Sequence, residues 1–293
     1  MSGRERARDQ WYLLLPAVLL LGVAVVIPVA RVILLSLSRV DLAEGATTFA
    51  GLDAYARLWG DSRWWSSWSN TLVFTGCSVA VELVAGVAFA LLLHRTFRGR
   101  GWVRALVILP WALPTAVMAL AWGWIFNDAF GVANDLLQRL GMIGAPVAWL
   151  GHPGTAMAAL IVADIWKTTP FVTLVVLAGL QSISADVLEA ARLDGLSAPQ
   201  RFRRIVLPLL VPTLLVAVAF RVVQAYGSFD LIYVLTGGGP GGSTETVSLY
   251  AFQNVFRYLD FGYGSAVATQ AALLLAIAAA LAAALAGRKG GRA

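Results

Sequence analysis

The chain has 293 residues, of which 59% are hydrophobic and only 13% are charged. Soluble chains average about 45–50% apolar and about 25% charged residues, so this composition excludes a water-soluble globular protein and also a disordered one. The net charge of +6 is scattered in short clusters between apolar runs, which favours lipid headgroups over nucleic acid as the charged partner. The single cysteine, Cys77, excludes an intramolecular disulfide framework and a cysteine-based metal cluster.

Six apolar runs are long enough to cross a bilayer, whose hydrocarbon core of about 30 Å needs roughly 20 helical residues. In chain order, the expected spans cover residues 11–38, 70–93, 105–126, 155–180, 205–229 and 264–287. The first run follows three arginines, as a cleavable signal peptide does. It is longer than the about 7–15 apolar residues of such a peptide and no A-x-A site ends it, so we expect it to be retained. The sequence therefore predicts an all-α integral membrane protein with six transmembrane helices.

Most arginines and lysines outside these runs lie on one side of the predicted membrane. They occupy the N-terminal tail, the loops after the second and fourth spans, and the C-terminal tail. Cytoplasmic segments carry the excess of positive charge, so both termini are expected in the cytoplasm. The domain plan is then a cytoplasmic tail at 1–10, a transmembrane domain at 11–287 and a second cytoplasmic tail at 288–293.

The chain offers no plausible catalytic or metal site. His94 and His152 are expected on opposite faces of the membrane, so they cannot share a metal ion. No serine stands in a G-x-S-x-G context. The glycine-rich run 237–242 lacks the lysine of a phosphate-binding loop, so a flexible turn is expected there instead of a nucleotide site. We therefore expect no catalytic residue, no metal and no ATP site in this chain.

Ionisable residues inside the expected spans are costly in a bilayer and are usually functional. Asp164 and Lys167 stand three residues apart in the fourth span, so they share a helix face and can neutralise each other. Glu82 stands alone in the second span. For Glu82 we expect hydrogen bonds within the helix bundle.

The fifth span carries a polar stripe made of Arg221, Gln224 and Ser228, which are spaced at i, i+3 and i+7. A polar stripe on a lipid-surrounded helix must face either another helix or an aqueous path. Two interpretations follow, a buried network between helices and the lining of a path for a polar substrate. We favour the substrate path.

The polar segment 181–207 joins the fourth and fifth spans on the expected cytoplasmic side. Gly195 is expected to stop one short helix, and Ser197 with Pro199 to start another. The small side chains of Ala190 and Ala191 allow close approach of a partner. The segment therefore predicts an elbow of two short helices that docks a soluble protein.

This segment resembles the EAA motif in the permease subunits of binding-protein-dependent ABC importers, which reads E-A-A, three residues, G, nine residues and I-x-L-P. Every fixed position is present, at Glu189, Ala190, Ala191, Gly195, Ile205, Leu207 and Pro208. Leu196 departs from the alanine that the family often has there. The chain also resembles the carbohydrate branch of this family over about residues 11–287, and most of all the MalF-type permeases of actinobacterial trehalose importers. The motifs that carry this resemblance are Asn70-Thr71-Leu72, Leu109-Pro110 with Pro114, Trp166-Lys167 with Pro170-Phe171, and Phe229-Asp230 through Gly238-Gly239-Pro240.

The resemblance implies the type I ABC importer permease fold and a transport subunit that carries out no chemistry itself. It also implies partners: a second homologous permease, two copies of a cytoplasmic ATPase that bind the ATP and Mg²⁺, and an extracytoplasmic sugar-binding protein or lipoprotein, with no nucleic acid. The implied location is the bacterial plasma membrane. The residues that would couple to the ATPase are Glu189, Ala190, Ala191, Asp194 and Gly195. Those that would contact the binding protein are Gly237, Gly238, Gly239 and Pro240.

The implied substrate is a sugar, such as the disaccharide trehalose. The matching sugar-site positions are Asp164, Trp166, Lys167, Thr168, Phe171, Arg221, Gln224, Ala225 and Ser228. An alternative in the same class is a permease for glycerol phosphate or another polar solute, because Arg221 and Lys167 could attract an anion. Alternatives from other classes are a membrane-embedded enzyme and a structural scaffold.

Overall fold

The computed structural model describes residues 14–43 and 45–290, with side chains described up to residue 280. Five helical segments are long and apolar enough to cross a membrane: Leu14–Ser36, Ser62–His94, Pro153–Gln181, Ala198–Tyr226 and Phe261–Ala280. A bent pair of helices supplies a sixth candidate. The expected tail at 1–10 lies outside the described residues, and the last helix continues through 288–290.

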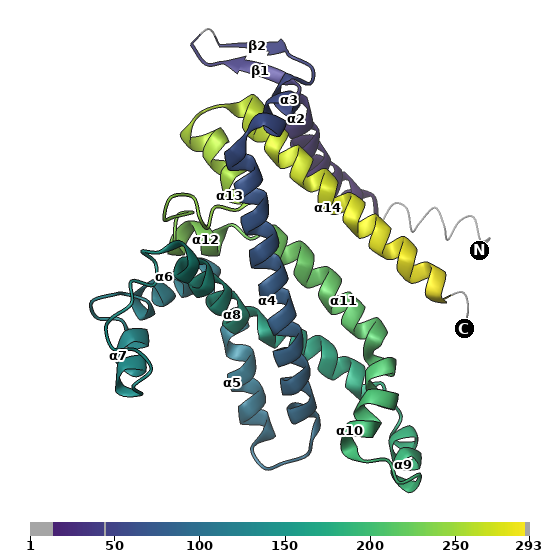
Figure 1. Cartoon of the computed structure of the whole chain (residues 1–293). Helices are drawn as coiled ribbons and strands as arrows, with labels where there is room; N and C mark the ends of the chain where they lie inside the picture. Colours follow the sequence, from purple (N-terminus) through teal and green to yellow (C-terminus); the bar gives the residue numbers. More distant parts are fainter. Residues whose placement is uncertain (1–13, 44, 291–293) are drawn as a thin grey trace, which may run out of the picture. The chain divides into compact units, whose positions relative to one another are not determined.

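The chain divides into two compact units, Met1–Trp64 with Tyr250–Ala293, and Trp65–Leu249. The first, here called the flanking unit, contains η1 (Gly22–Val26), α2 (Ile27–Ser36), β1 (Ser38–Asp41), β2 (Ala46–Phe49), α3 (Asp53–Gly60), η3 (Gln253–Arg257) and α14 (Phe261–Gly290). In it α2 contacts α14 (Figure 1). The strands form an antiparallel hairpin that pairs Ser38 with Phe49 and Asp41 with Ala46.

A cluster of hydrogen bonds around Asp61 stabilises the flanking unit. The Asp61 carboxylate accepts hydrogen bonds from the hydroxyls of Tyr250 and Tyr263. Burial opposes ionisation of this carboxyl, but these hydrogen bonds together with those from the backbone N–H groups of Arg63 and Trp64 outweigh it, so the pKa of Asp61 lies below its ordinary value. Arg57 donates to Asp260 at 2.7 Å and lies 4.0 Å above the Tyr263 ring. Together these contacts join α3 to the start of α14.

The second unit, here called the central unit, holds the candidate site. It contains most of α4 (Ser62–His94), then α5 (Arg100–Ala112), α6 (Thr115–Ile125), α7 (Val132–Arg139), α8 (Pro153–Gln181), α9 (Ala185–Leu193), α10 (Ala198–Arg201), η2 (Phe202–Val206), α11 (Leu207–Tyr226) and α12 (Asp230–Leu235). The helix α13 (Val247–Phe252) crosses the boundary of the two units. A buried core joins α4, α8 and α11, and its members are Ala90, Leu93, Val172, Val176, Leu177, Leu180, Val206 and Leu210.

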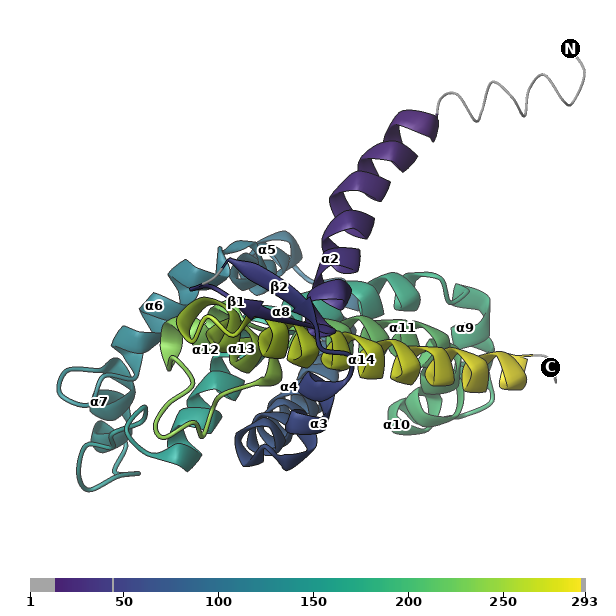
Figure 2. The same cartoon turned by 90° about the horizontal axis from the view of Figure 1, so that it is seen from above.

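The third expected span, 105–126, is not one continuous helix. It consists of α5 and α6, which meet at a bend of 98° (Figure 1 and Figure 2). Pro114 follows the break, and a proline disfavours the helical conformation in the residue before it. Leu113 accordingly has an extended ψ of 138°. The expected third span therefore corresponds to this bent pair, and the break within it was not predicted because apolar composition does not indicate where a helix bends.

The contact between α4 and α8 depends on a missing side chain at Gly86. A Cβ atom placed there would lie 2.5 Å from Cγ1 of Val172, whereas one at Gly76 on the same helix would meet nothing within 4 Å. Small residues permit such close approach of membrane helices.

Replacing Gly86 with alanine is therefore expected to destabilise the central unit by about 1–3 kcal/mol, the usual range for overpacking. The measurement is thermal unfolding of the purified chain in detergent. Gly76→Ala is the matched control and is expected to leave the melting temperature unchanged. Equal melting temperatures for the two variants would contradict the proposed close packing.

Candidate functional site

A buried cluster of charged side chains ties three helices of the central unit together. Arg221 on α11 is 1% exposed. Its Nε donates to Oε2 of Glu82 on α4 at 2.5 Å, and its Nη2 donates to Oε1 of Glu82 at 2.8 Å. The same Nη2 donates to Oδ2 of Asp164 on α8 at 3.0 Å. Buried charges are tolerated only when they are paired and hydrogen-bonded, and here one guanidinium serves two carboxylates.

The partners in this cluster confirm one expectation and show a different pairing for Asp164. Glu82 hydrogen-bonds within the bundle, as expected, and also accepts from the Thr168 hydroxyl at 2.5 Å. The sequence allowed Asp164 and Lys167 to neutralise each other, but the ion pair of Asp164 is with Arg221. The Lys167 ammonium instead donates to the carbonyl of Leu113 at 2.6 Å. It therefore links α8 to the break between α5 and α6.

A polar cavity of about 220 Å³ lies beside this cluster. Six of the nine predicted sugar-site residues line it: Asp164, Lys167, Thr168, Arg221, Gln224 and Ser228. The cavity, here called the inner cavity, also has walls that the prediction omitted: Thr115, Gly227, Phe229, Asp230 and Leu231. Arg221 and Gln224 on α11 thus face a polar space and a buried network at once, because Arg221 also joins the ion cluster. Ser228 lies beyond the end of α11 and reaches the cavity from the loop that follows it.

The other three predicted sugar-site residues do not line the inner cavity. Ala225 is 2% exposed and packed. Phe171 stacks on Phe220 with ring centroids 4.5 Å apart. Trp166 points into a different space, where its ring meets the edge of Trp122 at 5.8 Å. Trp166 lies two residues after Asp164 and so points about 200° away from it. Phe171 and Ala225 lie on the same helix faces as Asp164 and Arg221, but they are engaged in packing and do not reach the cavity.

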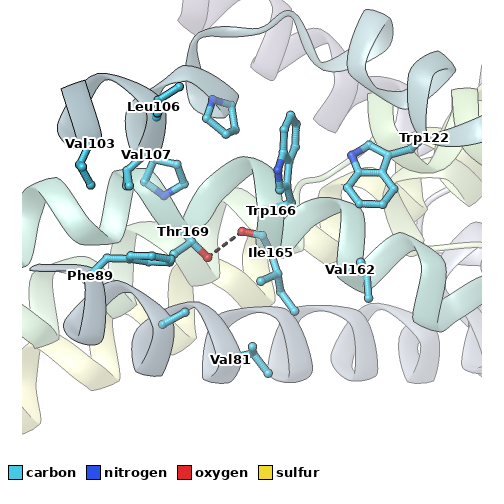
Figure 3. A pocket seen from close by; sticks show the side chains of 13 residues that line it. Val81, Phe89, Val103, Leu106, Val107, Trp122, Val162, Ile165, Trp166 and Thr169 are labelled. Atoms are coloured by element: carbon cyan, nitrogen blue, oxygen red, sulfur yellow. Dashed lines mark hydrogen bonds between the residues drawn. The ribbon is translucent and has the colours of Figure 1, made fainter. Parts of the chain in front are cut away.

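The space that Trp166 enters is an apolar groove of about 660 Å³ between α4, α5, α6 and α8 (Figure 3). Its walls include Val81, Phe89 and Ile165. The hydroxyl of Thr169 donates to the Ile165 carbonyl at 2.6 Å, as the dashed line in Figure 3 shows. With that hydroxyl engaged, the groove offers little to a polar solute.

The predicted coupling segment forms an elbow, but only its first helix is short: the second, α10, runs on through η2 into α11 as one helical segment, Ala198–Tyr226. Helix α9 begins after Ser184, whose side chain accepts from the Asp186 backbone N–H, and ends before Asp194. Gly195 follows with a φ of +75°, a conformation that favours glycine. A capping box between Ser197 and Gln200 starts α10. The elbow lies beyond the ends of α8 and α11 (Figure 1).

The side chains of α9 are divided between the core and solvent. Glu189, Ala190 and Asp194 are exposed, as a docking surface requires. Ala191 is only 3% exposed, and Leu188 packs against the core of the unit. Ala191 therefore helps to seat the helix, whereas the other three residues face outward.

The glycine-rich loop is held in place by hydrogen bonds. Asn70 on α4 donates through Nδ2 to the carbonyls of Gly242 and Glu245, each at 3.0 Å. Gly237, Gly238, Gly241 and Gly242 all have positive φ. A Cβ atom at Gly238 would lie 2.9 Å from the Leu249 side chain.

Within the described residues, no group of three or more His, Cys, Asp or Glu could hold a metal ion.

Comparison with known proteins identifies the family. Residues 82–289 match the family described as "Binding-protein-dependent transport system inner membrane component". The chain is 42% identical over 271 residues to the trehalose/maltose transport system permease protein MalF of Thermococcus litoralis, covering 92% of this chain and 91% of that protein. It is 36% identical over 268 residues to the trehalose transport system permease protein SugA of Mycobacterium tuberculosis, covering 91% and 85%.

Another relative is the sulfoquinovosyl glycerol transport system permease protein SmoG of Agrobacterium fabrum, 41% identical over 257 residues and covering 87% of this chain and 83% of that protein. Among solved structures, a bacterial ABC transporter that imports the acidic polysaccharide alginate matches with a TM-score of 0.84 and 22% identity, covering 97% of this chain and 96% of that one. The fold is therefore that of a type I ABC importer permease, an inner-membrane transport subunit without a catalytic role. This chain belongs to the inner-membrane permease components of binding-protein-dependent ABC transporters.

Proposed function

We propose that this chain is the permease subunit of an ABC importer for a neutral sugar, a disaccharide such as trehalose or maltose, and that the inner cavity takes part of that sugar. Two relatives with long matches are named for trehalose or for trehalose and maltose. A second homologous permease would complete the path. Two copies of a cytoplasmic ATPase would bind ATP and Mg²⁺, one docking on α9 of this chain and the other on the partner permease, and an extracytoplasmic protein would deliver the sugar near the glycine-rich loop.

The observation that carries this proposal is the chemistry of the inner cavity. The Oε1 atom of Gln224 accepts from Arg221 at 2.6 Å, which leaves its amide N–H groups to donate into the cavity. Ser228 and Thr115 add hydroxyls. Each sugar hydroxyl both donates and accepts, and this wall offers both kinds of partner.

The electrostatics of the cavity oppose the alternative of a phosphorylated substrate. The guanidinium of Arg221 is already paired with Glu82 and Asp164. Asp230 adds a third carboxylate to this region, against the single further positive charge of Lys167. An anion entering the cavity would meet more negative than positive groups, so a neutral solute fits better.

In the proposed mechanism the site residues bind and orient sugar, and the elbow transmits movement. Closure of the ATPase on ATP would push α9, which is seated on the core by Leu188 and Ala191. That core joins α8 and α11, the two helices that supply the charged cluster and Gln224 to the wall of the inner cavity. Movement of the elbow would therefore reach the sugar-binding wall through packed side chains and open it alternately to each side.

The test is uptake by proteoliposomes that contain the full complex, with trehalose, maltose and glycerol 3-phosphate as competing substrates. Gln224→Ala is expected to raise the half-saturation concentration about two- to tenfold, as the loss of a hydrogen bond worth about 0.5–1.5 kcal/mol does. Thr169→Val on the opposite face of α8 is the matched control and should change nothing. An unchanged half-saturation concentration in Gln224→Ala, or preferred uptake of the phosphate, would refute the proposal.

A further inference from the structure

A second cavity lies in the central unit at the N-terminal end of α8; its lining is more apolar than polar but includes the polar side chains of Ser66, Ser69, Asn70 and Ser243. It has a volume of about 490 Å³. Helix α4 contributes Ser69 and Asn70, α8 contributes Gly154 and Met157, and the glycine-rich loop contributes Gly241 and Gly242. This space, here called the outer cavity, shares no lining residue with the inner cavity.

The two cavities lie along one stripe of α8. Asp164 follows Met157 by seven residues. This spacing places the two side chains within about 20° of the same helix face and about 10 Å apart along the helix axis. Thr168, one turn further, also lines the inner cavity. The apolar groove uses the opposite stripe, with Val162, Ile165 and Trp166. The polar side chains of this stripe, Asp164 and Thr168, line the inner cavity, whereas α8 contributes only Pro153, Gly154 and Met157 to the outer cavity.

The backbone is unusually accessible in the outer cavity. Cβ atoms placed at Gly154, Gly241 or Gly242 would meet nothing within 4 Å. The positive φ values account for glycine at 241 and 242, but Gly154 has neither a positive φ nor a close neighbour. The absence of a side chain at Gly154 leaves its backbone open to a ligand in the outer cavity.

The side chain of Asn70 has a fixed orientation at the cavity wall. Its Nδ2 group donates to two loop carbonyls, so its Oδ1 atom remains as an acceptor. Ser69 is exposed in the same wall. Among the described residues, none of the side chains that line the outer cavity is charged. This chemistry suits a neutral polyhydroxylated solute and not an ion.

We propose that the outer cavity is a second carbohydrate subsite, which holds the sugar before it moves about two helical turns along α8 into the inner cavity. The inference rests on the proposed sugar-import function. Asn70 would have two tasks, since it anchors the glycine-rich loop and accepts from a sugar hydroxyl. The loop backbone and the glycine of α8 would form the opposite walls.

The test uses thiol protection, because Cys77 is the only cysteine of the chain and Cys77→Ser gives a background without thiols. Three single variants follow: Ser69→Cys in the outer cavity, Ser228→Cys in the inner cavity, and Ser182→Cys outside both as the control. The complex with its partner permease and ATPase is reconstituted without binding protein and treated with a small methanethiosulfonate reagent. Bound ligand slows modification by a factor of 1 + [L]/Kd, so trehalose or maltose at four times its Kd gives about fivefold protection.

Protection of both Ser69→Cys and Ser228→Cys, with none at Ser182→Cys, is the expected result. Protection at Ser228→Cys alone would overturn the outer subsite and leave the proposed function standing. Protection at Ser69→Cys alone would support the outer subsite and remove the inner one. If only sugar-free binding protein protects Ser69→Cys, the outer cavity is a protein-docking surface and the subsite is refuted.

A filling variant gives an independent measurement. Gly154→Leu places a side chain in the outer cavity and is expected to lower the maximal rate of uptake several-fold, while Ser228→Cys in the same chain keeps its protection by sugar. Gly76→Leu is the matched control, since a Cβ there also meets nothing within 4 Å. Equal uptake by the two leucine variants would contradict the subsite.

Discussion

Arg221→Met is expected to lower the stability of the chain by about 3–5 kcal/mol, the range measured when one partner of a buried ion pair is removed. The change would leave Glu82 and Asp164, which are 0% and 6% exposed, without their positive partner. Native proteins have only about 5–15 kcal/mol of net stability, so much of the variant should fail to fold. The measurement is the yield of monodisperse protein and its thermal unfolding in detergent.

Two comparisons separate this effect from a general sensitivity to arginine loss. Arg139→Met breaks an exposed pair with Asp135, whose side chains are 76% and 58% exposed, and such pairs contribute about 0–1 kcal/mol. The triple variant Arg221→Met, Glu82→Gln, Asp164→Asn removes all charge from the cluster and should recover most of the stability. Equal melting temperatures for Arg221→Met and Arg139→Met would show that the cluster does not hold the three helices together as its geometry indicates.

Much of the fold could be predicted because bilayer thickness and apolar run length are directly linked. Five of the six expected spans correspond to long helices, with ends that moved by several residues; α4 begins at Ser62, before the expected residue 70. The break at Pro114 was missed, although the residue before a proline is a known position for a helix to end. A count of apolar residues registers length and ignores where the backbone can turn.

The candidate site was predictable along each helix and not across helices. The spacing of Arg221 and Gln224 predicts one face of α11, and the inner cavity lies on that face, although α11 ends at Tyr226 and Ser228 lines the cavity from the following loop. The pairing of Arg221 with Glu82 joins residues 139 apart in sequence, and nothing local to either residue indicates it. Trp166 was predicted to line the sugar site together with Asp164. The two residues are two positions apart, which turns a helix by about 200°, and the ring of Trp166 therefore enters the apolar groove.

The second large effect is expected at the elbow. Gly195→Val should reduce sugar uptake and sugar-stimulated ATP hydrolysis by about tenfold or more while the complex still assembles. Gly195 has a φ of +75°, and the left-handed conformation costs other L-residues about 1–2 kcal/mol, with β-branched residues among the worst. A penalty of about 1.4 kcal/mol already corresponds to a factor of ten.

The strain should act on coupling and not on folding, because Gly195 is exposed and a Cβ there would meet nothing within 4 Å. Valine would instead favour a different backbone angle between α9 and α10, and so would misdirect Glu189 and Asp194 relative to the ATPase. Gly195→Asn is the matched control, since asparagine tolerates the left-handed conformation, and it should keep most of the uptake. Full transport by Gly195→Val, with normal assembly shown by co-purification of the ATPase, would mean that the angle of the elbow is not needed to couple ATP hydrolysis to transport.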